Sequence, residues 1–127
     1  MKNRKLKNSE LKRINNREFK SSKKTPLIVI LDNIRSLNNI GSVFRTSDAF
    51  LIEKIYLCGI TAKPPHKDIH KTALGATDSV EWEYAEDTLA LVRLLKSEGK
   101  AIVSVEQAEE SVSLEGFKTK PDTTYAI

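Results

Sequence analysis

The sequence predicts an α/β fold, with a mostly parallel sheet and helices on both of its faces. Apolar runs typical of strands alternate along the chain with segments of helical periodicity, which is the pattern of repeated βαβ units. The first run, LIVIL at residues 27–31, is apolar at every position. A run of this kind is typical of a strand that is covered on both faces.

The elements follow one another in an order set by periodicity and turn residues. Strands are expected at 27–31, 54–59, 80–84 and 101–107, with one more starting at 124, and helices at 39–50, within 63–76 and at 85–99. The helix at 39–50 is expected to turn one apolar face inward, formed by Ile40, Val43, Phe44 and Ala49. Gly75 and Gly99 are the expected helix stops.

A basic arm over residues 1–25 precedes the expected α/β domain over residues 26–127. The arm holds ten Lys and Arg against two Glu, a balance of +8, whereas the remainder of the chain has a balance of −4. Such an arm suits a polyanion such as RNA, and a solvated tail is the alternative. Residues 9–19 within it, SELKRINNREF, predict a short helix with Ser9 as its N-cap.

The turn after the first strand carries the most informative residues. It reads DNIRSLNNIGSVFRTSDAF from residue 32, and ligands of such folds meet the loops at the carboxyl ends of the strands. Gly41 permits close backbone approach, and Asn38 and Asn39 can cap the helix or fix the loop. Arg35 and Arg45 offer planar charged groups suited to phosphate. Arg45 follows Asn39 by six residues, so we expect it to reach toward the same crevice.

Plainer roles stay open for each of these residues. Asn39 could be an N-cap alone, Gly41 a packing contact, and Arg45 a surface charge. The segment contains neither G-x-G-x-x-G nor G-x-x-x-x-G-K-[ST], so no motif indicates a dinucleotide or P-loop site.

The stretch NNIGSVFRTSDAF closely resembles the first motif of the SpoU (TrmH-type) RNA 2′-O-methyltransferases of the SPOUT class. In that motif a glycine follows an asparagine by two residues and an arginine follows it by six, positions that here are Asn39, Gly41 and Arg45. The later stretches IEKIYLCG, KTALGA and VEWEY are also similar to this family. The resemblance extends from about Pro26 to the last residue.

The resemblance implies an enzyme that transfers a methyl group from S-adenosylmethionine to a ribose 2′-hydroxyl of tRNA or rRNA. It implies a homodimer with a trefoil knot at the carboxyl end of the sheet. It also implies that Arg45 is the catalytic residue and that Asn39 helps to order the site. Arg35, Asn38, Gly41 and Arg45 are the expected substrate-binding residues.

The family has two further motifs beyond the strand that starts at residue 124: a Gly-Asn-Glu-type loop and a Ser-Leu-Asn-type segment. Together they form the knot and most of the S-adenosylmethionine pocket. The sequence ends at Ile127, before both, so we expect the 127-residue chain to be inactive alone. Val105 is the one expected cofactor-binding residue, with a plain core valine as the alternative. A non-catalytic RNA-binding relative is the second class of function left open.

Other candidate residues favour structural roles. His66 and His70 could share a helix face, but no third or fourth zinc ligand stands near them, so no metal is expected. Cys58 lies in an apolar run and is expected in the core. The rings of Tyr56, Trp82 and Tyr84 could stack on bases, but core or dimer packing is the expected role. No stretch approaches the ~20 apolar residues of a membrane span, and a cytoplasmic protein is expected.

Overall fold

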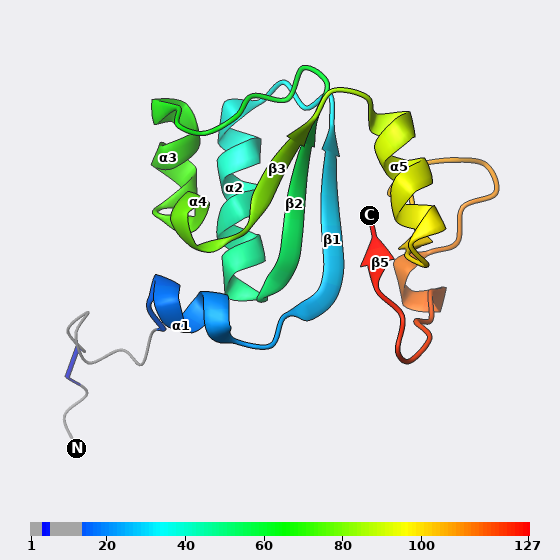
Figure 1. The fold of residues 1–127 in the computed structure, drawn as a ribbon, viewed down its shortest axis with the longest axis horizontal. Helices are drawn as coiled ribbons and strands as arrows, with labels where there is room; N and C mark the ends of the chain where they lie inside the picture. Colours follow the sequence, from blue (N-terminus) through cyan, green and yellow to red (C-terminus); the bar gives the residue numbers. More distant parts are fainter. Residues whose placement is uncertain (1–3, 6–13) are drawn as a thin grey trace.

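The computed structural model describes residues 4–5 and 14–127 and contains a parallel five-stranded sheet in the order β3-β2-β1-β5-β4 (Figure 1). The strands are β1 (Thr25–Asp32), β2 (Ile52–Cys58), β3 (Trp82–Ala85), β4 (Ala101–Ile102) and β5 (Tyr125–Ala126). The helices are α1 (Asn16–Ser21), α2 (Leu37–Ala49), α3 (Lys67–Ala73), α4 (Ala76–Ser79) and α5 (Thr88–Ser97), with one 3₁₀ turn, η2 (Leu114–Gly116). The predicted fold class is confirmed.

The sheet separates two hydrophobic cores, because successive side chains of a strand point to opposite faces. Leu31 of β1 joins the core beneath α2 and α3, whereas Ile28 joins the core beneath α5. Figure 1 shows α2, α3 and α4 on one side of the sheet and α5 on the other. The unbroken apolar run of β1 therefore serves both cores, as the sequence predicted.

The three neighbouring strands β1, β2 and β3 end at one level. Asp32 of β1 pairs with Cys58 of β2, and Cys58 in turn pairs with Ala85 of β3. The loops that follow these strands therefore leave the sheet together at its carboxyl end.

Helix α5 begins three residues later than its sequence predicts and stops before Gly99, as predicted. Asp87 is its N-cap, and the Asp87 carboxylate accepts a hydrogen bond from the Ala90 N–H at 3.1 Å. Leu91 and Leu95 face the sheet and are buried. Gly99 lies just past the last turn with φ +88°, a left-handed conformation that glycine adopts without steric cost.

The strand expected over residues 101–107 is much shorter than predicted. β4 includes only Ala101 and Ile102, because its neighbour β5 offers only Tyr125 and Ala126 for pairing. A strand is stabilised only where a neighbour completes its hydrogen bonds. Val105 beyond it is 82% exposed.

Two expectations about helices also need correction. The helix expected over residues 9–19 begins, within the described residues, at Asn16, with Asn15 as its N-cap; Ser9 lies outside the described part of the chain. On α2 the expected inner position Ala49 is exposed, and Ser47 is buried in its place. Ala49 follows Ile40 by nine residues, about 180° around the helix, whereas Ser47 follows it by seven and shares its face.

Helix α1 is anchored to the folded body by one aromatic side chain. Phe19 is 1% exposed and belongs to the core beneath α2 and α3. The Lys24 ammonium lies 4.6 Å from the centre of the Phe19 ring. The core therefore includes a residue of the segment expected to be an arm.

The helices described between residues 14 and 127 are all too short or too polar to cross a lipid bilayer.

Candidate functional site

The loop from β1 to α2, residues 33–36, leaves the sheet where the loops after β2 and β3 also leave it (Figure 1). Arg35 in this loop is exposed. Within the described residues its guanidinium makes no hydrogen bond or ion pair. An unpaired planar cation in this position suits an anionic ligand such as a phosphate.

Ser36, and neither of the two asparagines, caps helix α2. The Ser36 hydroxyl accepts a hydrogen bond from the Asn39 N–H at 3.2 Å. Asn38 and Asn39 therefore lie in the first helical turn, and the expectation that they cap the helix is wrong. Both side chains are exposed, and neither amide is hydrogen-bonded to another described residue. Both amides are available to a ligand.

Gly41 lets α3 cross α2 at very short range. A Cβ atom at this position would lie 2.0 Å from the Thr72 hydroxyl and 2.3 Å from the Ile69 carbonyl oxygen. The Thr72 hydroxyl also donates a 2.9 Å hydrogen bond to the Asn38 carbonyl. The close backbone approach predicted at Gly41 is made by α3. Since Gly41 is buried, its placement favours the packing role over direct contact with a ligand.

Arg45 is exposed on α2 and has no ion pair or hydrogen bond among the described residues. It follows Asn39 by about 9 Å along the helix axis and about 120° around it. One turn before Arg45, Gly41 touches α3, so Arg45 lies on the flank of α2 nearer to α3. Asn39 and Arg45 therefore lie on different flanks of α2, and the expectation that Arg45 reaches toward the crevice beside Asn39 stays a prediction.

A mostly apolar groove runs along the opposite flank of α2. Its volume is about 630 Å³, and its lining includes Asn39 and Val43 of α2, Val29 of β1 and Ile127. Arg45 is not part of this lining. The two motif residues thus belong to two different surfaces of the same helix.

Val105, the expected cofactor contact, follows β4 at the carboxyl end of the sheet. Its side chain is 82% exposed, so this position offers no enclosed wall for an apolar or methyl-bearing ligand. Glu106 next to it is also exposed, and one of its carboxylate oxygens accepts a hydrogen bond from the Gln107 N–H. The described residues therefore do not fit an S-adenosylmethionine pocket around Val105.

The two histidines have structural partners. His66 caps α3, its Nδ1 atom accepting from the Asp68 N–H at 3.1 Å. The His70 Nδ1 atom lies 3.4 Å from the Thr77 hydroxyl. Among residues 4–5 and 14–127, no group of three or more His, Cys, Asp or Glu side chains is placed to hold a metal ion.

Cys58 and the aromatic rings are packing residues, as predicted. Cys58 is fully buried, and burial raises the pKa of its thiol, which a hydrogen bond with Thr88 partly offsets. Trp82 and Tyr84 pack against the core beneath α2 and α3. Tyr56 packs against the other core. None of these rings is presented as a free stacking platform.

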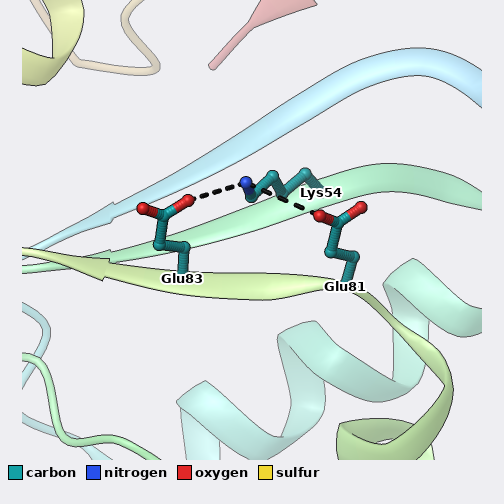
Figure 2. Close-up of polar contacts among 3 residues, drawn as sticks. All are labelled: Lys54, Glu81 and Glu83. Carbon is teal, nitrogen blue, oxygen red and sulfur yellow. Dashed lines mark hydrogen bonds and ion pairs between the residues drawn. The ribbon is translucent and has the colours of Figure 1, made fainter.

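A charged cluster across β2 and β3 was not predicted. Figure 2 shows the Lys54 ammonium between two carboxylates, 2.8 Å from Glu83 and 3.7 Å from Glu81. It also lies 4.8 Å from the centre of the Tyr56 ring. Burial lowers the pKa of Lys54, but the hydrogen bond to Glu83 and the interaction with Tyr56 outweigh it, so the net pKa is raised above 10.5. The cluster stabilises the sheet and lies apart from the residues of the motif.

Comparison with known proteins places these features in one family. Residues 26–127 match the family model of the SpoU rRNA Methylase family. The 23S rRNA (guanosine-2′-O-)-methyltransferase RlmB of Nitrosomonas europaea is 30% identical over 77 residues, which cover 61% of this chain and 30% of that protein. The chain thus spans less than a third of the length of this relative.

Solved structures share the fold. The TrmH/SpoU tRNA modifying enzyme of A. aeolicus superposes with a TM-score of 0.72 at 26% identity, over 88% of this chain and 56% of that one. An AdoMet-bound rRNA methyltransferase of Sinorhizobium meliloti superposes with a TM-score of 0.71 at 23% identity, over 82% of this chain and 39% of that one. The match over residues 26–127 covers most of the sequence, and the chain belongs to the SpoU rRNA methylase family.

Proposed function

We propose that the protein with this sequence is an RNA ribose 2′-O-methyltransferase that uses S-adenosylmethionine and acts on tRNA or rRNA. The observation that carries the proposal is the family match over residues 26–127, which includes all three motif residues on α2. The names of the relatives support the reaction and the substrate class, since they include an rRNA guanosine-2′-O-methyltransferase and a tRNA modifying enzyme.

Arg45 suits the substrate side of this reaction. When bound, S-adenosylmethionine would supply the methyl group, and a ribose 2′-hydroxyl that accepts a methyl group must give up its proton. Arginine is a poor general base, because its guanidinium stays protonated and has no lone pair to accept a proton. We therefore assign Arg45 to gripping the phosphate beside the ribose and stabilising the negative charge that develops on the attacking oxygen. Its guanidinium is exposed and has no hydrogen bond or ion pair with the residues that the structure describes, which supports that contact.

Asn38, Asn39 and Arg35 complete the proposed RNA contacts. The first two present their amides on the first turn of α2, and Arg35 presents its guanidinium in the preceding loop. Within the described part of the chain, none of these groups is hydrogen-bonded. Gly41 acts indirectly, by holding α2 against α3. We expect the protein to work as a homodimer in the cytoplasm. The separation of Asn39 and Arg45 on two flanks of α2 supports a site that draws on two chains.

The test uses a protein in which these 127 residues are followed by the Gly-Asn-Glu-type and Ser-Leu-Asn-type motifs of the family. It measures methyl transfer from radiolabelled S-adenosylmethionine to tRNA and rRNA transcripts. The product is located by the resistance of a 2′-O-methylated linkage to alkaline hydrolysis. The proposal predicts one resistant linkage per modified site, and labelled base with unchanged alkaline cleavage would contradict it.

A non-catalytic RNA-binding protein is the second candidate. The observation that favours it is the exposure of Val105, which leaves the expected donor contact without an enclosing pocket. RNA binding without S-adenosylmethionine binding, measured by calorimetry, would select this candidate. S-adenosylmethionine binding at micromolar concentration would exclude it.

A further inference from the structure

Three hydrogen bonds join the loop that carries Arg35 to the segment that follows β2. The Asn33 N–H donates to the Cys58 carbonyl at 3.2 Å, and the Ile60 N–H donates to the Asn33 side-chain oxygen at 2.9 Å. The Ile34 N–H donates to the Thr61 hydroxyl at 3.0 Å. These bonds fix both residues that precede Arg35.

Thr61 is the centre of this connection. Its hydroxyl accepts from Ile34 and donates to the Leu31 carbonyl at 2.9 Å, so one buried group bridges the end of β1 and the loop. Thr61 is 2% exposed. A buried hydroxyl that uses both of its hydrogen-bonding roles holds its partners in one geometry.

The backbone around Asn33 is shaped to fit this connection. Asn33 has φ +52°, a left-handed conformation that asparagine tolerates better than most residues. Gly59 has φ +64°, and a Cβ atom there would lie 2.0 Å from the Asn33 side-chain oxygen. Gly59 is joined to β3 through its N–H, which donates to the Ala85 carbonyl, and its carbonyl, which accepts from the Tyr84 hydroxyl. The loops after β1 and β2 are thus held to each other and to the end of β3.

We propose that Thr61, together with Asn33, is a positioning residue for RNA binding: it holds the β1–α2 loop so that Arg35 meets an RNA phosphate. Arg35 itself has no bond to any described residue, so its direction depends on the backbone of residues 33 and 34. The proposal rests on the proposed function, because RNA is the ligand that Arg35 is assigned to meet.

A double-mutant cycle on Thr61 and Arg35 tests the proposal, with binding of a fluorescein-labelled tRNA transcript as the measurement. Thr61→Val removes the hydroxyl and keeps the shape of the side chain. We expect Thr61→Val and Arg35→Ala each to weaken binding by roughly fivefold. Each should also flatten the slope of log affinity against log salt concentration by about one unit, the effect of one lost phosphate contact. We expect the double variant to bind no worse than Arg35→Ala. Thr61 acts on RNA binding only through Arg35, so its loss costs no further affinity once the Arg35 guanidinium is gone.

Two further variants separate positioning from folding. Thr61→Ser keeps the hydroxyl and should bind within about twofold of the wild type. Ser79→Ala removes another buried hydroxyl, which donates to the Asp48 carboxylate and the Ala76 carbonyl. Ser79 lies just before β3 begins, at the end of the sheet opposite to Thr61. Ser79→Ala should lower the melting temperature by roughly as much as Thr61→Val, about 5 to 10 °C, and leave RNA affinity unchanged.

Multiplicative losses in the double variant, or wild-type affinity of Thr61→Val, would overturn the proposal while leaving RNA binding intact. Wild-type affinity of Arg35→Ala would overturn it as well. Failure of the wild-type protein to bind the transcript would instead contradict the proposed function itself.

Discussion

Helix α2 carries one residue that serves packing and two that we propose contact RNA. Gly41 is buried against α3, whereas the side chains of Asn39 and Arg45 are exposed on two flanks of the helix and bond to no other described residue. The sequence predicted that these residues stand out, but not which of them faces inward. Nor could it predict the N-cap, because Ser36 and Asn39 are both favourable capping residues and only the observed start of the helix distinguishes them.

Gly41→Ala tests the packing role. Its Cβ atom would overlap the Thr72 hydroxyl and the Ile69 carbonyl, and the second is backbone that cannot rotate away. We expect the free energy of unfolding to fall by about 2 kcal/mol in urea denaturation. Gly116→Ala is the control, because its Cβ atom would meet neighbours only at 3.5 Å and beyond; it should change stability by less than about 0.5 kcal/mol. Equal stability of the two variants would contradict the packing role.

Whole elements were predictable where their pattern is local. The strand around residues 27–31 and the helix around residues 85–99 carry complete local signals, and both are present with small shifts of their ends. The strand expected at 101–107 has an equally good local pattern, but its length depends on a partner strand distant in the sequence. For the same reason the Lys54 cluster was invisible, since it forms only when β2 and β3 pair.

Lys54→Met tests the cluster at the scale of these two strands. The folded-state pKa of Lys54 is raised above 10.5, so its contribution is complete below pH 10.5 and is lost as pH rises through the folded-state value. We expect the variant to be less stable by about 1 kcal/mol at neutral pH. Urea denaturation across a pH series should show the two proteins converging above pH 10.5.

Lys96→Met, on the exposed side of α5, serves as the control and should match the wild type at every pH. A Lys54→Met deficit that persists undiminished at high pH would show that packing of the side chain, and not its charge, is what the variant loses.

In the whole molecule the basic segment overlaps the hydrophobic core, whereas the sequence predicted a basic arm separate from the folded domain. The excess of positive charge lies in residues 1–25, but Phe19 within this segment fills the core and Thr25 begins β1. Composition reveals where charge accumulates, whereas only tertiary packing reveals that an aromatic residue in a basic segment is buried. An experiment on the arm should therefore act upstream of Phe19.

Replacing Lys2, Lys5, Lys7 and Lys12 with Gln removes four charges from the arm and leaves Phe19 in place. We expect RNA binding to weaken and the slope of log affinity against log salt to flatten by about two to four units, because each phosphate contact releases counterions. The matched control replaces Arg93, Lys96, Lys118 and Lys120 with Gln, for the same change in net charge. A salt slope equal in the two variants would show that the arm adds only to the overall charge.

The most direct measurement is the turnover of Arg45→Lys in the methyl-transfer assay. Lysine keeps the charge but cannot form bidentate hydrogen bonds to a phosphate, and it lacks the planar donors that a guanidinium places beside the attacking oxygen. We predict that turnover falls by about a hundredfold, with RNA affinity changed much less, and that Arg93→Lys on α5 matches the wild type. Near-full turnover of Arg45→Lys would contradict the assignment of Arg45 to the reacting ribose and phosphate.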